Sequence, residues 1–120
     1  MTTLFVLLIA FQIKHFLCDY PLQGQYMLGK FKEKDWELPL AAHALVHAVF
    51  TFFIAAFFGL QIAIAVALLD FGIHFIVDRI KVNTSRGLTT QNPKFWWFLG
   101  LDQFAHHITH YAIIAILIFL

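Results

Sequence analysis

The sequence predicts an all-α integral membrane protein, a four-helix bundle that forms one domain over residues 1–120. Three observations predict this class. Of the 120 residues, 61% are hydrophobic and only 12% are charged, whereas soluble domains average about 45–50% and about 25%. The apolar residues fall into four stretches, each near the ~20 residues that span a bilayer. Within these stretches, ionisable residues recur every fourth position, which places them on one face of a helix.

The first predicted helix covers about residues 4–20 and ends where Pro21 interrupts the apolar run. The second covers about residues 38–58. Pro39 suits its first turn, where the missing backbone N–H costs nothing. Gly59 ends this helix.

The third predicted helix, about residues 60–80, follows Gly59 directly. Because this connection is short and uncharged, the second and third helices should form a tight antiparallel hairpin. Residues 95–98 are all aromatic and suit the headgroup region of a bilayer. Gly100 interrupts that run, and the fourth predicted helix covers about residues 102–120.

The basic residues predict the orientation of the bundle. All of them except Lys14 lie in or beside the two long loops, and the remaining connection carries none. The positive-inside rule then places both loops in the cytoplasm and both termini on the non-cytoplasmic side. The lipid bilayer is the expected partner, and a net charge of +1 gives no sign of nucleic-acid binding.

Each predicted helix carries one polar stripe, which lipid does not accept and which must therefore face the other helices. With the helix directions above, all four stripes meet in the cytoplasmic half of the bilayer. The shallow layer holds Asp19, His43, Asp78 and Asp102, and the next holds His15, His47, His74 and His106. The deepest layer holds Thr51, Asp70 and His110.

Imidazole and carboxylate groups together suit a divalent transition metal, zinc first, with manganese, iron or nickel as alternatives. The candidate ligands are His15, Asp19, His43, His47, His74, Asp78, Asp102, His106 and His110. Two adjacent layers also suit two ions with bridging aspartates. The alternatives are polar packing between helices, a proton relay, and a haem between histidines. His107 lies off the stripe and has no predicted role.

The candidate catalytic residues are His74, Asp78 and Lys81. Lys81 lies one turn beyond Asp78, where it can stabilise an anion, although a lysine that only reaches for the headgroups fits the sequence equally well. We expect a metal-dependent hydrolase of a lipid or of a phosphate or acyl ester, acting at the cytoplasmic face. A metal-ion or proton transporter or channel is the alternative that Asp70 and His110 favour. A structural or interaction protein with a structural metal is the third alternative, and each allows a homo-oligomer.

The polar segments also resemble a known family. They are residues 15–23 (HFLCDYPLQ), residues 43–47 (HALVH) with Thr51, His74 with Asp78 and Lys81, and Asp102-Gln103 with His106. In these the chain resembles the domain-of-unknown-function family 3307, small membrane proteins of bacteria and their phages. The resemblance covers nearly the whole chain and implies a bacterial or phage origin, so we expect the membrane to be a bacterial inner membrane, but it implies no activity. A weaker similarity, in size and in histidine-rich membrane helices, is to membrane-bound metal-dependent hydrolases.

Overall fold

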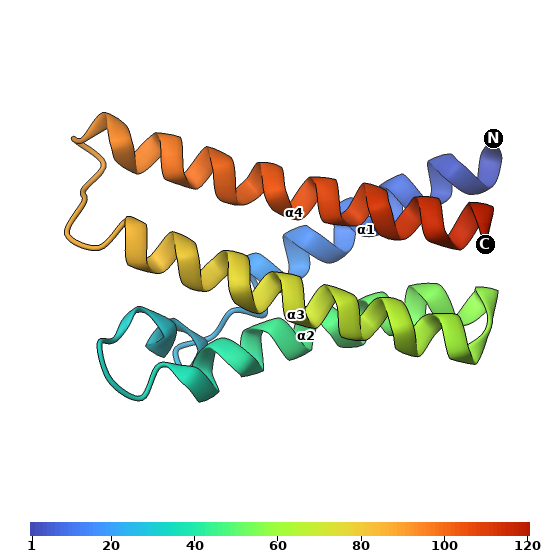
Figure 1. Cartoon of the computed structure of the whole chain (residues 1–120), viewed down its shortest axis with the longest axis horizontal. Coiled ribbons are helices and arrows are strands. Elements are labelled where there is room, and N and C mark those ends of the chain that lie inside the picture. The colour runs from blue at the N-terminus through green and yellow to red at the C-terminus, as the bar shows by residue number, and fades with distance from the viewer.

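The computed structural model describes all 120 residues, and its regular structure is entirely helical. Four long helices lie along the long axis of the molecule (Figure 1). They are α1 (Thr2–Asp19), α2 (Glu37–Ala55), α3 (Leu60–Thr84) and α4 (Pro93–Phe119). Two short 3-10 helices, η1 (Met27–Phe31) and η2 (Ala56–Phe58), lie before and after α2. The predicted all-α class is confirmed.

Three segments are long and apolar enough to cross a membrane, namely Thr2–Asp19, Glu37–Phe58 and Leu60–Thr84. α4 has 27 residues but is not among them. It carries Lys94 and Asp102 together with three histidines, which lower its mean hydropathy. The structure therefore supports a membrane protein with three candidate spanning helices.

α4 begins nine residues earlier than the sequence predicted, at Pro93 instead of residue 102. The side chain of Asn92 caps the helix by accepting a hydrogen bond from the backbone N–H of Lys94 (3.0 Å). Pro93 occupies the first turn, where proline is well tolerated. The helix then continues through Gly100, where the sequence reading placed a break.

The predicted hairpin between α2 and α3 is confirmed. α2 ends at Ala55, η2 extends it to Phe58, and α3 starts at Leu60. Gly59 alone connects them, with φ at +130°, a conformation that L-residues with side chains rarely adopt. α2 and α3 form the most extensive helix contact in the molecule.

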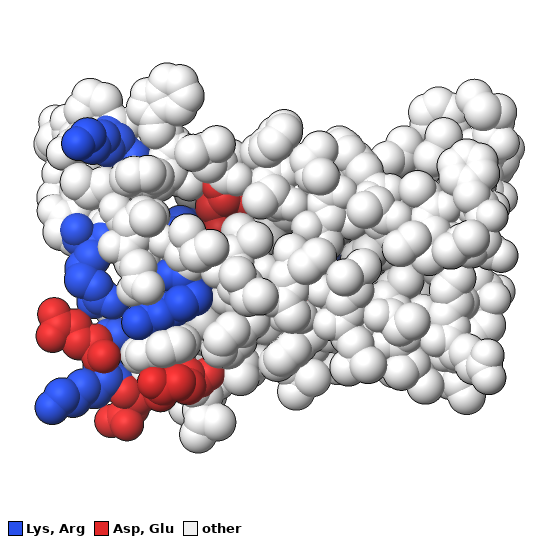
Figure 2. All heavy atoms as spheres, in the orientation of Figure 1, with Lys and Arg blue, Asp and Glu red and all other residues white.

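The two ends of the bundle differ in charge. Both long loops lie at one end, and the termini and the α2–α3 connection lie at the other (Figure 1). On the face shown in Figure 2, the lysine, arginine, aspartate and glutamate side chains gather at the end with the long loops, and the opposite half of that face is free of them. We call these the charged end and the apolar end. Large apolar side chains cover the outside of the helices, as a bilayer requires.

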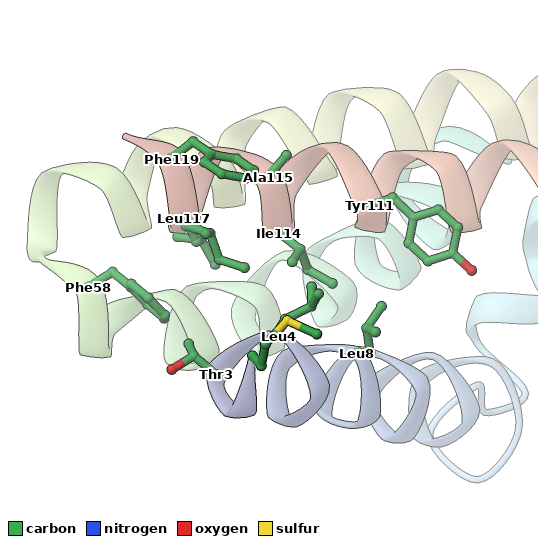
Figure 3. A pocket seen from close by; sticks show the side chains of 11 residues that line it. Thr3, Leu4, Leu8, Phe58, Tyr111, Ile114, Ala115, Leu117 and Phe119 are labelled. Carbon is green, nitrogen blue, oxygen red and sulfur yellow. The ribbon is translucent and has the colours of Figure 1, made fainter.

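The interior has two parts. Toward the apolar end it is a hydrophobic core of Leu7, Phe11, Ala55, Ala63, Val66, Ile113, Ile114 and Leu117. α1 and α4 separate there and leave an apolar groove of about 810 Å³, into which Leu4 and Leu8 point from α1 and Ile114 and Leu117 from α4 (Figure 3). Toward the charged end the interior is polar.

Candidate metal centre

The polar stripes of all four helices converge inside the bundle, as the sequence predicted. Nine of the converging histidines and aspartates and one lysine are buried: Lys14, His15, His43, His47, Asp70, His74, Asp78, Asp102, His106 and His110. Asp19 is partly exposed at its edge. Burying this many ionisable groups is costly unless they pair with one another or bind a cation.

Four of the predicted ligands form a compact group, which we call the ligand group: Asp19, His43, His47 and His74. One potential ligand atom from each residue lies within 4.8 Å of all the others. Asp19 Oδ1 is 2.8 Å from His47 Nε2 and 3.3 Å from His43 Nε2. The i, i+4 spacing places both histidines on one face of α2, and α1 and α3 supply the other two residues.

The donor set of the ligand group fits a metal. The Nδ1 atoms of His43 and His47 are buried without any hydrogen-bond partner. The imidazole of His74 makes no hydrogen bond, and its ring stacks on His47 at 3.9 Å between centroids. Buried polar atoms left without partners cost about 1–3 kcal/mol each. The Nε2 atoms of the same two rings face Asp19 Oδ1, and a donor set of imidazoles and a carboxylate suits zinc.

His15 lies between Asp19 and Gln103 and is not part of the ligand group. Its Nε2 is 3.1 Å from Asp19 Oδ2 and 2.7 Å from Gln103 Oε1. Gln103 in turn donates from Nε2 to Asp102 Oδ2 (2.9 Å), and Asp102 Oδ1 is 3.2 Å from His106 Nε2. We call this sequence of contacts the His15–Gln103 link. The sequence reading gave Gln103 no chemical role, because glutamine carries no signal of its own.

Two lysines neutralise Asp78. Lys30 of η1 is buried, and its Nζ is 2.6 Å from Asp78 Oδ2. Lys81 Nζ lies 3.6 Å from Asp78 Oδ1, as the spacing of the two residues suggested. His43 Nε2 is 4.0 Å from Asp78. The sequence reading counted Lys30 only as a loop charge and missed its burial.

The deep layer forms a cluster of its own. Lys14 Nζ is 2.7 Å from Asp70 Oδ2 and 3.2 Å from His110 Nε2, and Thr51 donates its hydroxyl to Asp70. His110 therefore contacts a lysine and lies outside the ligand group. His107 is partly exposed, and its ring is 5.1 Å from that of His15, which agrees with its predicted place off the stripe.

A cavity of about 140 Å³ adjoins the ligand group at the charged end. We call it the polar cavity. Its lining residues come from every long helix and from η1, and they are Asp19, Tyr20, Gln23, Lys30, His43, His74, Asp78, Lys81, Leu99, Asp102, Gln103 and His106. The larger groove at the apolar end holds no histidine or carboxylate (Figure 3), so of these two spaces only the polar cavity adjoins candidate metal ligands.

A second groove, of about 300 Å³, lies between α3 and α4 beside the polar cavity. We call it the side groove. It shares Lys81 and Asp102 with the polar cavity, and most of its other lining is apolar. The side groove and the polar cavity thus meet at these two residues.

Comparison with known proteins gives one match. The family described as "Protein of unknown function (DUF3307)" matches residues 5–120. No curated protein and no solved structure matches the chain.

Proposed function

Because the chain belongs to the family described as "Protein of unknown function (DUF3307)", we propose its function from its own residues, as a metal-dependent membrane hydrolase of a lipid phosphate or acyl ester. One observation carries the proposal. The polar cavity brings Asp19, His43 and His74 of the ligand group next to Lys81. A site that only stabilises the fold has no need of a cavity against its ligands.

The proposed placement puts all four helices across a bacterial inner membrane. α4 contacts α3 and α1 and returns the chain to the end where it began (Figure 1). The basic residues gather at the charged end (Figure 2), so the positive-inside rule places that end in the cytoplasm. The polar cavity then opens among the lipid headgroups of the cytoplasmic leaflet.

Zinc is the proposed ion, held by Asp19, His43, His47 and His74. A divalent ion there would activate a water molecule and polarise a phosphoryl or carbonyl oxygen. His47 does not line the polar cavity, so it would hold the ion on the side away from the cavity. Open coordination toward the cavity is what separates catalytic from structural zinc sites.

The two lysines would bind the negative charge of the substrate. Lys81 is the more available one, because its contact with Asp78 is 3.6 Å long and its side chain is partly exposed. Asp78 is tightly paired with Lys30, so we assign it a positioning role, in place of the catalytic role that the sequence suggested. His74 remains a ligand that faces the cavity.

The side groove favours an amphiphilic substrate. Its apolar lining, including Val77, Ile80, Leu101 and Ala105, leads from the outside of α3 and α4 to Lys81 and Asp102. An acyl chain fits such a lining, while the headgroup attached to it would reach the lysine. A water-soluble ester has no acyl chain to occupy this groove.

Transport of protons or a metal ion is the second candidate, and the deep cluster around Asp70 favours it. However, Lys14 already neutralises Asp70, and the core beyond the cluster is entirely hydrophobic. An ion crossing that core would lose its hydration at a cost of several kcal/mol or more. Hydrolysis at the charged end requires no such passage.

The test uses purified protein in phosphatidylcholine vesicles that contain phosphatidic acid, with zinc added. We expect release of inorganic phosphate or of fatty acid, abolished by a chelator and by His43→Ala. Lys81→Met should lower the rate by about 10²-fold, as removing one donor to a developing charge does elsewhere. Lys94→Met, which removes an exposed lysine at the same end, should leave the rate unchanged.

Glycerol phosphate serves as the matched substrate without acyl chains, and we expect it to be cleaved far more slowly. Bound metal with no cleavage of either ester bond would mean a structural ion. Proton or zinc flux into the vesicles that disappears in Asp70→Asn would instead identify a transporter.

A further inference from the structure

We propose that a second divalent cation binds at Asp102 and His106, on the α4 side of the polar cavity. The inference rests on the proposed function, because it places this ion next to the first and makes the hydrolytic site a two-ion centre. Two neighbouring ions can hold the attacking and the leaving oxygen of an ester together.

Asp102 provides the first reason. Its side chain is only 4% exposed, and it lines the polar cavity. Its Oδ1 atom is fully buried and has no hydrogen-bond donor, although Oδ2 accepts a hydrogen bond from Gln103. A buried carboxylate oxygen without a donor is rare in folded proteins, and an ion is one of the few partners that explains it.

The pairing of the buried carboxylates provides the second reason. Asp70 has Lys14, and Asp78 has Lys30 and Lys81. Asp19 and Asp102 have no lysine or arginine partner, only imidazoles and an amide. In the proposed site, the ion of the ligand group supplies the counter-charge for Asp19. Asp102 needs a counter-charge for the same reason, and we assign it a second cation.

The His15–Gln103 link provides the third reason, because it contacts the same oxygen atom, Oδ2, of Asp19 and of Asp102. It holds Oδ2 of Asp19 through His15 and Oδ2 of Asp102 through Gln103. Each carboxylate therefore keeps Oδ1 for an imidazole or an ion, His47 in one case and His106 in the other. Such outer contacts are how proteins orient the residues that bind metals.

The two positions are neighbours. The ring of His106 stacks on that of His74 at 4.1 Å between centroids, and His74 belongs to the ligand group. Both rings line the polar cavity. With two protein ligands, the second ion would complete its coordination with water or with the oxygens of the substrate, as divalent ions at phosphate sites commonly do.

An ordinary ion pair between His106 and Asp102 is the competing explanation. Their contact is 3.2 Å long, but it lacks hydrogen-bond geometry, since Oδ1 has no donor. An ion pair would also leave the protein with a single metal, which can be measured.

The experiment counts ions in detergent-purified protein that has been incubated with manganese(II) and then desalted. We expect about two manganese ions per chain in the wild type and about one in Asp102→Asn and in His106→Gln. His47→Ala should lose the ion of the ligand group. His107→Gln, a change to the adjacent histidine, should keep both ions, because that residue contacts no carboxylate.

Electron paramagnetic resonance of the wild type tests adjacency without any substitution, and a spin-coupled manganese pair is the expected signal. About one ion per chain in the wild type, or two uncoupled ions, overturns this inference and leaves the proposed function standing. About two ions retained in both Asp102→Asn and His106→Gln also overturns it. No ion in any sample overturns the proposed function as well.

Discussion

Lys14 is a charged residue in the apolar helix α1, and its side chain is almost completely buried. Its ammonium group contacts Asp70 and His110, and the Phe11 ring lies 5.8 Å away. A long lysine in a membrane helix usually extends to the interface, but Lys14 instead reaches inward to another helix. Because each partner alone would be an uncompensated buried charge, Lys14 and Asp70 depend on each other.

We predict that Lys14→Met destabilises the protein by about 3–5 kcal/mol, the usual cost of removing one partner of a buried ion pair. The double variant Lys14→Met/Asp70→Leu should recover most of that loss, because no charge remains unpaired. Denaturant unfolding in micelles, followed by circular dichroism, measures both, with Lys94→Met as the exposed control. A double variant no more stable than the single one would show that the pair is not the reason for the loss.

Single residues also mark how far the sequence could predict the site. The i, i+4 stripes identified every member of the ligand group, because a helix puts such residues on one face whatever surrounds it. The sequence did not predict the burial of Lys30, since this burial depends on where η1 packs and not on any periodic pattern. His110 was grouped with the metal ligands, but the reach of Lys14 across the bundle gave it another partner.

Among the elements, η1 has the clearest link between packing and the site. It carries Lys30 to Asp78 and packs against the first turn of α2. Gly29 makes this close approach feasible: a Cβ atom there would lie 2.9 Å from Pro39 Cγ and 3.2 Å from Pro39 Cβ. A proline ring cannot move aside as a flexible side chain would.

Gly29→Ala should therefore push η1 away from α2 and weaken the contact between Lys30 and Asp78. We predict a loss of about 1–3 kcal/mol, typical of overpacking, together with lower hydrolytic activity. Gly24→Ala is the matched control, because nothing lies within 4 Å of a Cβ atom at that position. Thermal unfolding in detergent compares the two, and equal midpoints would contradict this account of η1.

The helices themselves were predictable to different degrees. Long apolar runs in the sequence closely predicted the positions of α1, α2 and α3, because the length of such a run matches what a bilayer requires. For α4, Gly100 was read as a break, but packing along the rest of a long helix easily outweighs one glycine. Asn92 and Pro93 signalled the true start of that helix in the sequence.

At the scale of the whole molecule, the polar and apolar ends define how the protein sits in a membrane. Both termini lie at the apolar end and both long loops at the charged end (Figure 1). We predict that all four helices cross the bilayer, an even number of crossings that accounts for this arrangement and brings the four polar stripes into one half of the membrane.

Cysteine labelling tests this placement. In a Cys18→Ala background, we predict that Ser85→Cys reacts only from the cytoplasm, while Thr2→Cys and Leu120→Cys react only from outside. Membrane-impermeant maleimide on intact cells and on inverted vesicles makes the measurement. Cytoplasmic labelling at Leu120 with external labelling at Thr2 would mean that α4 does not cross, and labelling of all three positions from the opposite sides would mean an inverted bundle.

The single-residue connection at Gly59 has a consequence for how the protein is made. In the proposed placement, the segment between α2 and α3 must cross the bilayer when the protein is made, and transferring charged groups is the costly part of that movement. Residues 56–60 (AFFGL) carry no charge, and α2 and α3 already pack closely along their length. Because no charge has to be transferred, α2 and α3 can enter the lipid together as a preformed hairpin.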